Sequence, residues 1–453
     1  MSEREFDVVV LGMGPGAEYL AEELAKAGVS VAAVEEHLVG GECPYWGCVP
    51  SKMMIRAANA LTEGRRIAGL AGSAVISPSW APVAKRIRDD ATDNWDDIVA
   101  ADRFTGLGGA LVRGHGRITA PGEVTVGDEV LRARRGIVIG TGTQPFIPPV
   151  DGLAHTPYWT NHEAIETEEV PPSLLILGGG AVGAELGQVF ARFGSSVTII
   201  EGSPRLLPLE EPESGELAAK VFRADGIKVS TGTPAESVRH DGFQFTITLQ
   251  GGRQCNGERL LVATGRKTDL AGLGVGAIGL NEQSRFINVT DRMVAAPGVW
   301  ALGDVVGHGA FTHMSMYHAR IILGELLNRP RHPAEYHAVP RVTFTDPEIG
   351  SVGLTEAQAR EQHGDRIATA VTQIPSSSRG WIHKAGNDGF IKLVADRERG
   401  ILVGATSAGP TGGEVLSMLT LAVHAQVPVQ RLTEMIYAYP TFHRAVEDAL
   451  SRL

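Results

Sequence analysis

The sequence has few cysteines, no excess of positive charge and no long apolar run. Three of its 453 residues are cysteines and none belongs to a C-x-x-C pair, which disfavours a metal site and fits a reducing, cytoplasmic location. Acidic residues outnumber basic ones by 52 to 41, so neither nucleic acid nor an anionic membrane is an expected partner. No apolar run approaches the roughly 18 residues of a membrane span, and the charged segment 1–7 lacks the apolar core of a secretory signal. We therefore expect a soluble enzyme.

Two of the three cysteines lie close together, as Cys43 and Cys48 in the segment GGECPYWGCVPSK, residues 40–52. Residues five apart on an ideal helix have Cα atoms roughly 8.7 Å apart, whereas a disulfide tolerates about 7 Å. If the sulfurs pair, the segment departs from regular helix, and Pro44 and Gly47 supply the distortion. A helix beginning near Gly47 would direct amide groups at Cys48 and lower the pKa of its thiol. We predict a redox-active dithiol; the alternative is a static disulfide.

Glycine is abundant, with 56 residues, and glycine-rich turns occur in two similar segments. Each segment reads as a strand, a glycine-rich turn, a helix and a second strand that ends in an acid, over residues 6–35 and 174–201. The key small residues are Gly12, Gly14, Gly16 and Ala17 in the first turn, and Gly178, Gly180 and Gly183 in the second. The offset is 166 residues both between the first glycines and between the acids Glu35 and Glu201. Two such patterns with one internal spacing indicate two Rossmann-type domains.

Each position in these turns has a predicted role. The first glycine permits the tight turn, the second lets the backbone approach a pyrophosphate, and the third position must be small for the helix to pack against the strand. Glu35 and Glu201 are expected to bind ribose hydroxyls. The alternative for either acid alone is a solvated strand end.

The cysteine segment resembles the redox motif of the flavoprotein disulfide reductases, which include lipoamide dehydrogenase, glutathione reductase and mercuric reductase. The chain keeps both cysteines, Gly47 and the Pro-Ser-Lys at 50–52, but departs from the motif at Glu42 and at residues 44–46. Segments 136–143, 260–266 and 300–304 resemble the family's strand exits and its second flavin motif, and segments 339–353 and 389–393 resemble its dimerisation domain. The resemblance covers nearly the whole chain and is least clear over residues 64–97.

The resemblance implies an α/β fold with two Rossmann-type dinucleotide-binding domains and an α+β C-terminal dimerisation domain, in a homodimer. The expected division is an FAD-binding domain over 1–150 and 271–335, an NAD(P)-binding domain over 151–270 and a dimerisation domain over 336–453.

The resemblance also places FAD in the first nucleotide domain and NAD(P) in the second, an order that the dithiol beside the first turn supports. The expected FAD residues are Gly12, Gly14, Gly16, Ala17, Glu35, Gly41, Lys52, Gly116, Thr141, Gly142 and Asp304, and the expected NAD residues are Gly178, Gly180, Gly183, Glu201 and Gly265. Lys52 and Glu185 match a pair that lies beside the flavin in the family. Glu201 would repel a 2′-phosphate, so NADH is preferred to NADPH. Arg205 is the opposing signal: it either contacts a 2′-phosphate or is an ordinary surface cation.

The family's catalytic acid–base pair is missing. Members normally carry His-Pro-Thr-x-x-Glu near the C-terminus, where this chain has Tyr439 and Arg444 at the histidine and glutamate positions. Because the reference pKa is near 10 for phenol and roughly 6.5 for imidazole, Tyr439 is a poor general base, and we expect weak turnover of lipoamide-like dithiols. In a helical reading His443 lies one turn from Tyr439, about 6 Å away, too far to replace the base. His313 and His318, near the second flavin motif, are expected to be packing or solvent residues.

Two functions follow from these residues. The first is an FAD-dependent NAD(P)H oxidoreductase that passes hydride equivalents through the flavin to the Cys43–Cys48 disulfide and on to a disulfide substrate of the lipoamide type. The second is a quinone or metal-ion reductase, because Tyr439 and Arg444 replace the acid–base pair and such acceptors need little proton transfer at sulfur. By the family resemblance, a tyrosine at position 439 is also a feature of mercuric reductases, but the chain lacks their C-terminal cysteine pair and N-terminal metal-binding module. A non-catalytic binding subunit would require damaged glycine-rich turns, and neither turn is damaged.

Overall fold

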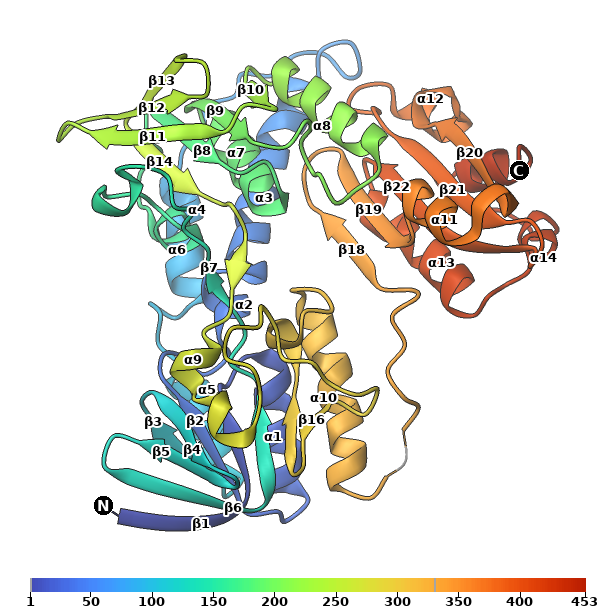
Figure 1. Cartoon of the computed structure of the whole chain (residues 1–453). Helices are drawn as coiled ribbons and strands as arrows, with labels where there is room; N and C mark the ends of the chain where they lie inside the picture. Colours follow the sequence, from blue (N-terminus) through green and yellow to red (C-terminus); the bar gives the residue numbers. More distant parts are fainter. Residues whose placement is uncertain (1, 330) are drawn as a thin grey trace. The chain divides into compact units, whose positions relative to one another are not determined.

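The computed structural model describes residues 2–329 and 331–453 (Figure 1). It divides into two compact units, each assembled from three stretches of the chain. The first unit contains the residues up to Pro50, Lys85–Phe146 and Arg266–Glu335, and the second contains Ser51–Ala84, Ile147–Gly265 and Tyr336–Leu453. No helix in the described residues is both long and apolar enough to span a membrane.

The first unit is built on a sheet with the strand order β16-β17-β6-β1-β2-β3. Its parallel strands are β1 (Ser2–Leu11), β2 (Val31–Glu35), β3 (Ala110–Arg113), β6 (Glu129–Ile139) and β17 (Val299–Ala301), and its antiparallel additions are β4 (Gly116–Ala120), β5 (Glu123–Val126) and β16 (Val294–Ala296). Val8 to Val10 are fully buried on both faces of the sheet, as expected for a central parallel strand. Helices α1 (Pro15–Lys26) and α10 (Thr312–Leu326) lie side by side (Figure 1).

The second unit contains a parallel sheet of order β10-β9-β8-β14 and a three-stranded antiparallel sheet. The parallel strands are β8 (Ser173–Leu177), β9 (Ser196–Glu201), β10 (Lys228–Thr231) and β14 (Arg259–Val262), and the others are β11 (Ala235–His240), β12 (Phe245–Leu249) and β13 (Gln254–Gly257). Its helices are α4 (Ala81–Arg86), α6 (Asn161–Glu166), α7 (Ala181–Arg192) and α8 (Pro212–Ala224). Trp80 stacks on Phe190 of α7 with ring centroids 5.4 Å apart, which fastens the segment 51–84 to this sheet.

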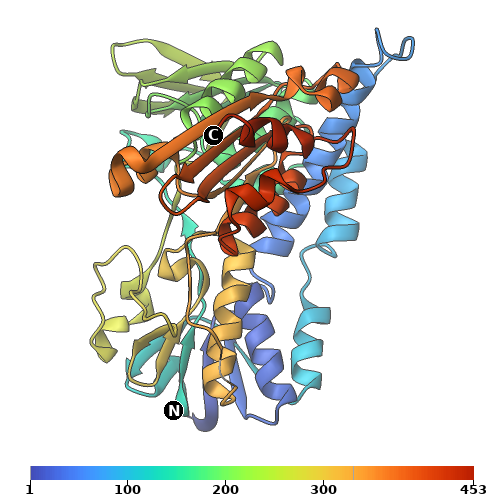
Figure 2. The same cartoon turned by 90° about the vertical axis from the view of Figure 1, so that its right-hand side faces the viewer.

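The C-terminal part of the second unit is a five-stranded antiparallel sheet covered by helices on both faces. The strands, in sheet order, are β18 (Pro340–Thr343), β19 (Glu348–Gly353), β22 (Ile401–Gly409), β21 (Phe390–Asp396) and β20 (Ile367–Gln373). Leu393 packs with helices α13 (Gly412–His424) and α15 (Arg444–Leu450), whereas its neighbour Val394 packs with α11 (Glu356–His363). This alternation is the period of two that a strand imposes. Figure 2 shows the red C-terminal helices against this sheet.

The predicted repeat is present in the structure. Helix α1 covers residues 15–26 and α7 covers residues 181–192, an offset of 166 at both ends. The strands β1 and β2 in the first unit correspond to β8 and β9 in the second. The α/β fold class and its two Rossmann-type units are therefore confirmed.

Candidate functional site

The first glycine-rich turn is closed by the acid at the end of β2. The Glu35 carboxylate accepts the backbone N–H of Met13 at 2.7 Å and that of His37 at 2.8 Å. Burial raises the pKa of Glu35, and these two hydrogen bonds oppose the rise. A carboxylate has about four acceptor positions, so two hydrogen bonds leave room for the ribose hydroxyls predicted from the sequence.

The second turn repeats this arrangement. The Glu201 carboxylate accepts the N–H of Gly179 and the N–H of Ser203, both at 2.7 Å. These partners lie 166 residues after Met13 and His37. The sequence indicated the two acids but not the amides they hold.

Both turns fit the pyrophosphate of a dinucleotide. Gly14 and Gly180 are the N-cap residues of α1 and α7, and because glycine has no side chain, neither caps the first-turn amides. The space where a Cβ would stand at Gly14 or Gly180 is open. At Gly12 and Gly178, by contrast, φ is positive and a Cβ would lie 2.7 Å and 2.2 Å from a backbone carbonyl oxygen. No side chain fits at Gly12 or Gly178, whereas the space beside the backbone of Gly14 and Gly180 is open.

Four of the predicted small residues have packing roles. A Cβ at Gly16 would lie 2.5 Å from the carbonyl oxygen of Ser315 in α10, so glycine there allows α1 and α10 to approach. Ala17 of α1 is fully buried, and Gly183 lies against the carbonyl oxygen of Gly178 in its own glycine-rich turn. Gly116 begins β4 and faces the side chains of Leu11 and Val34.

The two strand exits with Thr-Gly pairs are also equivalent. The Gly140 N–H donates to Leu11 O after β6, and the Ala263 N–H donates to Leu177 O after β14, both at 2.7 Å. Gly142 and Gly265, which follow, have φ of +64° and +116° with open space around them. Thr141 immediately precedes Gly142, and all three residues lie at the ends of parallel strands, where α/β proteins bind ligands.

Asp304 is held by residues that the sequence did not indicate. It lies in a 3-10 turn, Gly303–Val306, and its carboxylate accepts a hydrogen bond from the Thr143 hydroxyl at 3.0 Å. Burial raises the pKa of Asp304, and the Thr143 hydrogen bond opposes this. Arg266 donates to the Thr143 hydroxyl at 2.8 Å and pairs with Glu42 at 3.5 Å. A chain of polar contacts therefore runs from Asp304 through Thr143 and Arg266 to Glu42, the residue before Cys43. The only sign of this chain in the sequence was that Thr143 and Arg266 directly follow Gly142 and Gly265.

The two cysteines lie on either side of a helix break, as predicted. Cys43 belongs to the short helix α2 (Glu42–Tyr45), residues 46–47 form a turn, and Cys48 begins α3 (Cys48–Arg65). Both cysteines are thiols, and the hydrogen bond between them, together with burial, raises the pKa of Cys43. The Thr312 hydroxyl lies 3.5 Å from the Cys48 sulfur and opposes the rise at Cys43. Because α10 begins at Thr312, the N-termini of α3 and α10 both lie at the dithiol and favour a thiolate there.

Tyr45 anchors the chain between the cysteines. It is buried, and its hydroxyl donates to the carbonyl of Val39 at 3.1 Å. Burial raises the pKa of Tyr45 to about 12, so it is a neutral donor and no general base at neutral pH. The departure from the family motif at this position thus makes the redox segment more firmly attached.

Lys52 and Glu185 meet, as expected. Their ion pair measures 2.9 Å, and Glu185 is almost fully buried. Glu185 also accepts the backbone N–H of Phe344 at 2.8 Å, and the Lys52 ammonium lies 4.6 Å from the centre of the Phe344 ring. Phe344, which sequence reasoning did not select, therefore helps to fix the position of this cation.

His318 packs beneath the Asp304 turn. It is fully buried, and its Nδ1 accepts the N–H of Gly303 at 3.2 Å. Burial, with a smaller contribution from His308, lowers the pKa of His318 to about 4. His318 therefore packs in the interior and also holds the turn that carries Asp304.

The C-terminal pair that replaces histidine and glutamate forms a stacked contact. The Arg444 guanidinium lies 5.4 Å from the centre of the Tyr439 ring and also pairs with Glu447 at 3.0 Å. The helical reading of His443 is wrong: residues 439–443 form turns after Pro440, and α15 begins only at Arg444.

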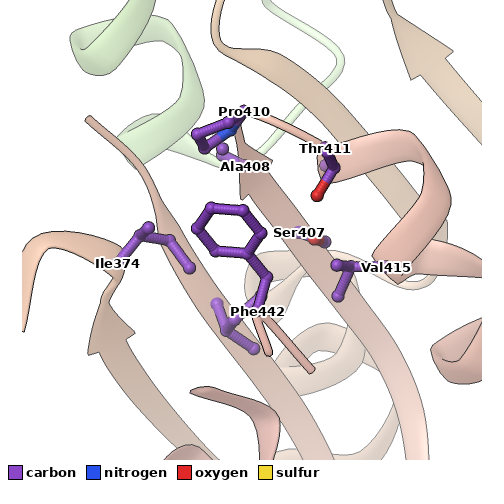
Figure 3. Close-up of a pocket in the computed structure, with 10 residues that line it drawn as sticks. Ile374, Ser407, Ala408, Pro410, Thr411, Val415 and Phe442 are labelled. Carbon is purple, nitrogen blue, oxygen red and sulfur yellow. The ribbon is translucent and has the colours of Figure 1, made fainter. Parts of the chain in front are cut away.

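Tyr439 is two-thirds exposed and helps to line an open hollow of about 350 Å³ with the segment 375–378 and Trp381. Phe442, three residues later, inserts its ring between Ile374 and Val415, as Figure 3 shows. This insertion fixes the turn that presents Tyr439.

Arg205 is neither an ordinary surface cation nor directed to solvent. Its guanidinium donates to the carbonyls of Pro208 at 3.1 Å and Glu210 at 3.3 Å. Neither of the two predictions, a 2′-phosphate ligand or a surface cation, included these contacts, because an arginine that binds carbonyls of its own loop has no sequence signature.

The chain matches two family models. Residues 6–320 match the model described as pyridine nucleotide-disulphide oxidoreductase, and residues 339–450 match the dimerisation domain of the same family. A mercuric reductase of Streptomyces lividans is 34% identical over 98% of this chain and 95% of its own length. A dihydrolipoyl dehydrogenase of Thermus scotoductus is 33% identical over 99% and 98%. Among solved structures, the Cu(II) complex of the HOCl-induced flavoprotein disulfide reductase RclA from Escherichia coli superposes with a TM-score of 0.87 at 26% identity, over 99% of this chain and all of that chain.

Removing the Thr312 hydroxyl should make the dithiol less reactive. The Thr312→Val variant keeps the side-chain volume but loses a hydrogen bond worth about 1 kcal/mol, so alkylation by iodoacetamide at neutral pH should slow roughly fivefold. The matched variant Thr312→Ser keeps the hydroxyl and should react like the parent. Equal rates in the valine and serine variants would contradict this role.

His318 should make stability depend on pH. Because the pKa of His318 is lowered on folding, its neutral form contributes full stability above pH 6.5 and loses it as the pH falls toward 4. At pH 5 the loss should reach roughly 2 kcal/mol. The His318→Asn variant keeps an acceptor but does not titrate, so urea unfolding at pH 7 and pH 5 should show the smaller loss in the variant. An equal loss in both proteins would exclude His318 as its source.

Proposed function

We propose that this chain, which belongs to the pyridine nucleotide-disulphide oxidoreductase family, uses NADH to reduce a thiophilic metal ion at its Cys43–Cys48 dithiol. Enzymes of this family are oxidoreductases that work with FAD and NAD(P)H. The observation that carries the choice of acceptor is the stacked Tyr439–Arg444 pair.

Disulfide and metal-ion acceptors differ in the proton transfer that they require. Reduction of a disulfide substrate needs a group that gives a proton to the leaving thiol and removes one from the attacking thiol, a task typically worth about 10² to 10⁴ in rate. A phenol beneath a guanidinium is poorly suited to that task at neutral pH. A metal ion accepts electrons without such a proton, so the missing pair costs it little.

The dithiol suits a soft metal ion. Thiolates are preferred ligands of such ions, and Cys43 and Cys48 are close enough to hydrogen bond to each other. Over the described residues no group of three or more His, Cys, Asp or Glu side chains is arranged around a common metal position, which suits an ion that binds as substrate and leaves. The dithiol becomes a disulfide and releases two protons, and its two electrons convert one Hg(II) to Hg(0) or two Cu(II) to two Cu(I). NADH and one proton then restore the dithiol and give NAD⁺, so each turnover consumes one NADH and releases one proton.

The chain's own residues bind and orient the cofactors. The first turn and Glu35 would hold FAD, whose bound isoalloxazine ring accepts hydride and passes electrons to sulfur. Lys52, held by Glu185, would supply the positive charge that the family's matching pair places beside the flavin. The helix N-termini at Cys48 and Thr312 favour thiolate at the acceptor side.

A disulfide of the lipoamide type, the first expectation from the sequence, is the second candidate. Reduction of such a disulfide needs two neighbouring thiols, and the Cys43–Cys48 hydrogen bond indicates that these two are close together. The dihydrolipoyl dehydrogenase of Thermus scotoductus is also nearly as similar to this chain as the mercuric reductase is.

We also propose that NADH is preferred to NADPH. Glu201, the acid at the end of β9, would repel a 2′-phosphate, and the Arg205 guanidinium donates to two carbonyls of its own loop. The four-segment domain division, the FAD and NAD residue sets, a homodimeric state and a cytoplasmic location are proposed on the same family relationship.

Restoring the missing pair should change the acceptor preference. In the parent, NADH-dependent turnover of Hg(II) or Cu(II) should exceed turnover of lipoamide. The Tyr439→His/Arg444→Glu variant should gain roughly 10- to 100-fold in lipoamide turnover and keep its metal turnover. A parent that already prefers lipoamide would contradict the metal assignment and support the second candidate.

Cys43 should be needed for every dithiol-dependent acceptor. The Cys43→Ser variant should lose metal and lipoamide turnover yet still be reduced by NADH in an anaerobic titration, taking up two reducing equivalents where the parent takes up four. A parent that takes up only two would show that the dithiol is redox-silent. Retained quinone turnover in the variant would point to a quinone acceptor instead.

The nucleotide preference should depend on Glu201. The ratio of kcat/KM for NADH to that for NADPH should exceed one in the parent and fall about tenfold, or roughly 1.4 kcal/mol, in Glu201→Gln. Glu35→Gln, the equivalent change in the first turn, should leave the ratio unaltered. A parent ratio below one would overturn the preference for NADH.

A further inference from the structure

The loop after β9 packs on the second glycine-rich turn. We call residues 202–211 the Arg205 loop. Its Leu207 N–H donates to the carbonyl of Gly179 at 2.9 Å, and a Cβ at Gly179 would lie 2.5 Å from the Leu206 side chain. At its start, the Ser203 N–H binds Glu201. Any displacement of the Arg205 loop therefore moves the turn proposed to bind NADH.

The Arg205 loop does not satisfy its own polar groups. Its arginine closes it through two carbonyls, and Leu207 has a positive φ of 49°, a conformation that costs energy for a residue other than glycine. Four buried atoms in the loop and the first turn of α8 have no hydrogen-bond partner among the described residues: Arg205 Nε, Glu210 Oε2, Glu213 Oε2 and Ser214 Oγ. Such a loop needs contacts from outside to keep one conformation.

Those contacts come from two cations of the C-terminal sheet. Arg341 of β18 donates to Glu210 at 2.6 Å, and Lys392 of β21 binds Glu211 at 3.0 Å. Lys392 and Glu211 are both buried, and the ammonium also binds Glu213 at 2.7 Å and Glu356 at 2.9 Å. Removal of a buried ammonium would leave three carboxylates facing one another, so its partners would separate.

We infer that Lys392 and Arg341 are positioning residues for the nicotinamide nucleotide. They hold the Arg205 loop against the second glycine-rich turn and keep Arg205 turned toward its own carbonyls, where it is unavailable to a 2′-phosphate. The C-terminal sheet thus sets both the affinity for NADH and the discrimination against NADPH. This inference rests on the proposed NADH site in the second nucleotide domain.

Substitution of Lys392 tests the inference against a matched control. In Lys392→Met, the Kd for NADH, measured by titration of the holoenzyme, should rise at least about fivefold, while kcat at saturating NADH stays within about twofold. The NADH to NADPH ratio of kcat/KM should fall, because the released Arg205 becomes available. Lys220→Met removes an exposed lysine of α8, which pairs with Asp388 at 2.7 Å, and should match the parent in all three quantities.

A second variant keeps the test decisive if Lys392→Met fails to fold. Arg341 is partly exposed, so Arg341→Gln should fold and show the same rise in Kd at constant kcat. A folded Lys392→Met or Arg341→Gln variant with the parent's Kd for NADH and the parent's nucleotide ratio would overturn the inference. The metal and lipoamide assays of the parent are independent of this result. Failure of the parent to bind NADH would instead overturn the proposed function, and the inference with it.

Discussion

Two carboxylates at strand ends hold the turns on which the rest of the molecule's chemistry depends. Glu35 and Glu201 each accept two backbone amides, one from the glycine-rich turn and one from the residue two positions beyond the acid. Because the acid holds the turn from the side, the helix that follows keeps its N-terminal amides free for a phosphate. The same device occurs twice at a spacing of 166 residues, so the two nucleotide sites are built by one local rule.

The dithiol is subject to opposing electrostatic effects. Its internal hydrogen bond and its burial keep Cys43 protonated, whereas two helix N-termini and the Thr312 hydroxyl favour a thiolate. Such a pair holds a proton until a ligand or an electron acceptor competes for the sulfur, which is the behaviour that the proposed metal substrate would need. Asp304 and the Glu42–Arg266 pair connect this centre with the second flavin motif through Thr143.

The C-terminal sheet contributes to both ends of the proposed electron path. Its Tyr439, beneath Arg444, stands in place of the histidine that disulfide exchange would need under the proposed function. At the donor side Lys392 and Arg341 bind the acids of the Arg205 loop. Under the two proposals, one domain combines a change in acceptor chemistry, through the exposed Tyr439 and its Arg444, with control of the Arg205 loop, through the buried Lys392.

By itself the sequence determined the fold class, the two nucleotide units, the helix break at the cysteines and the absence of the histidine–glutamate pair. These are local properties, because periodicity, glycine spacing and proline position act over a few residues. Only the tertiary structure decided that Thr312 lies at Cys48, that Arg266 reaches Thr143, that Lys392 binds Glu211 and that Arg205 folds onto its own loop. The first three join residues more than a hundred positions apart, and packing of whole elements sets such contacts. The helical reading of residues 439–443 was wrong because Pro440 disfavours a helix there, and the burial of Phe442 against the sheet adds a tertiary constraint on the same turn.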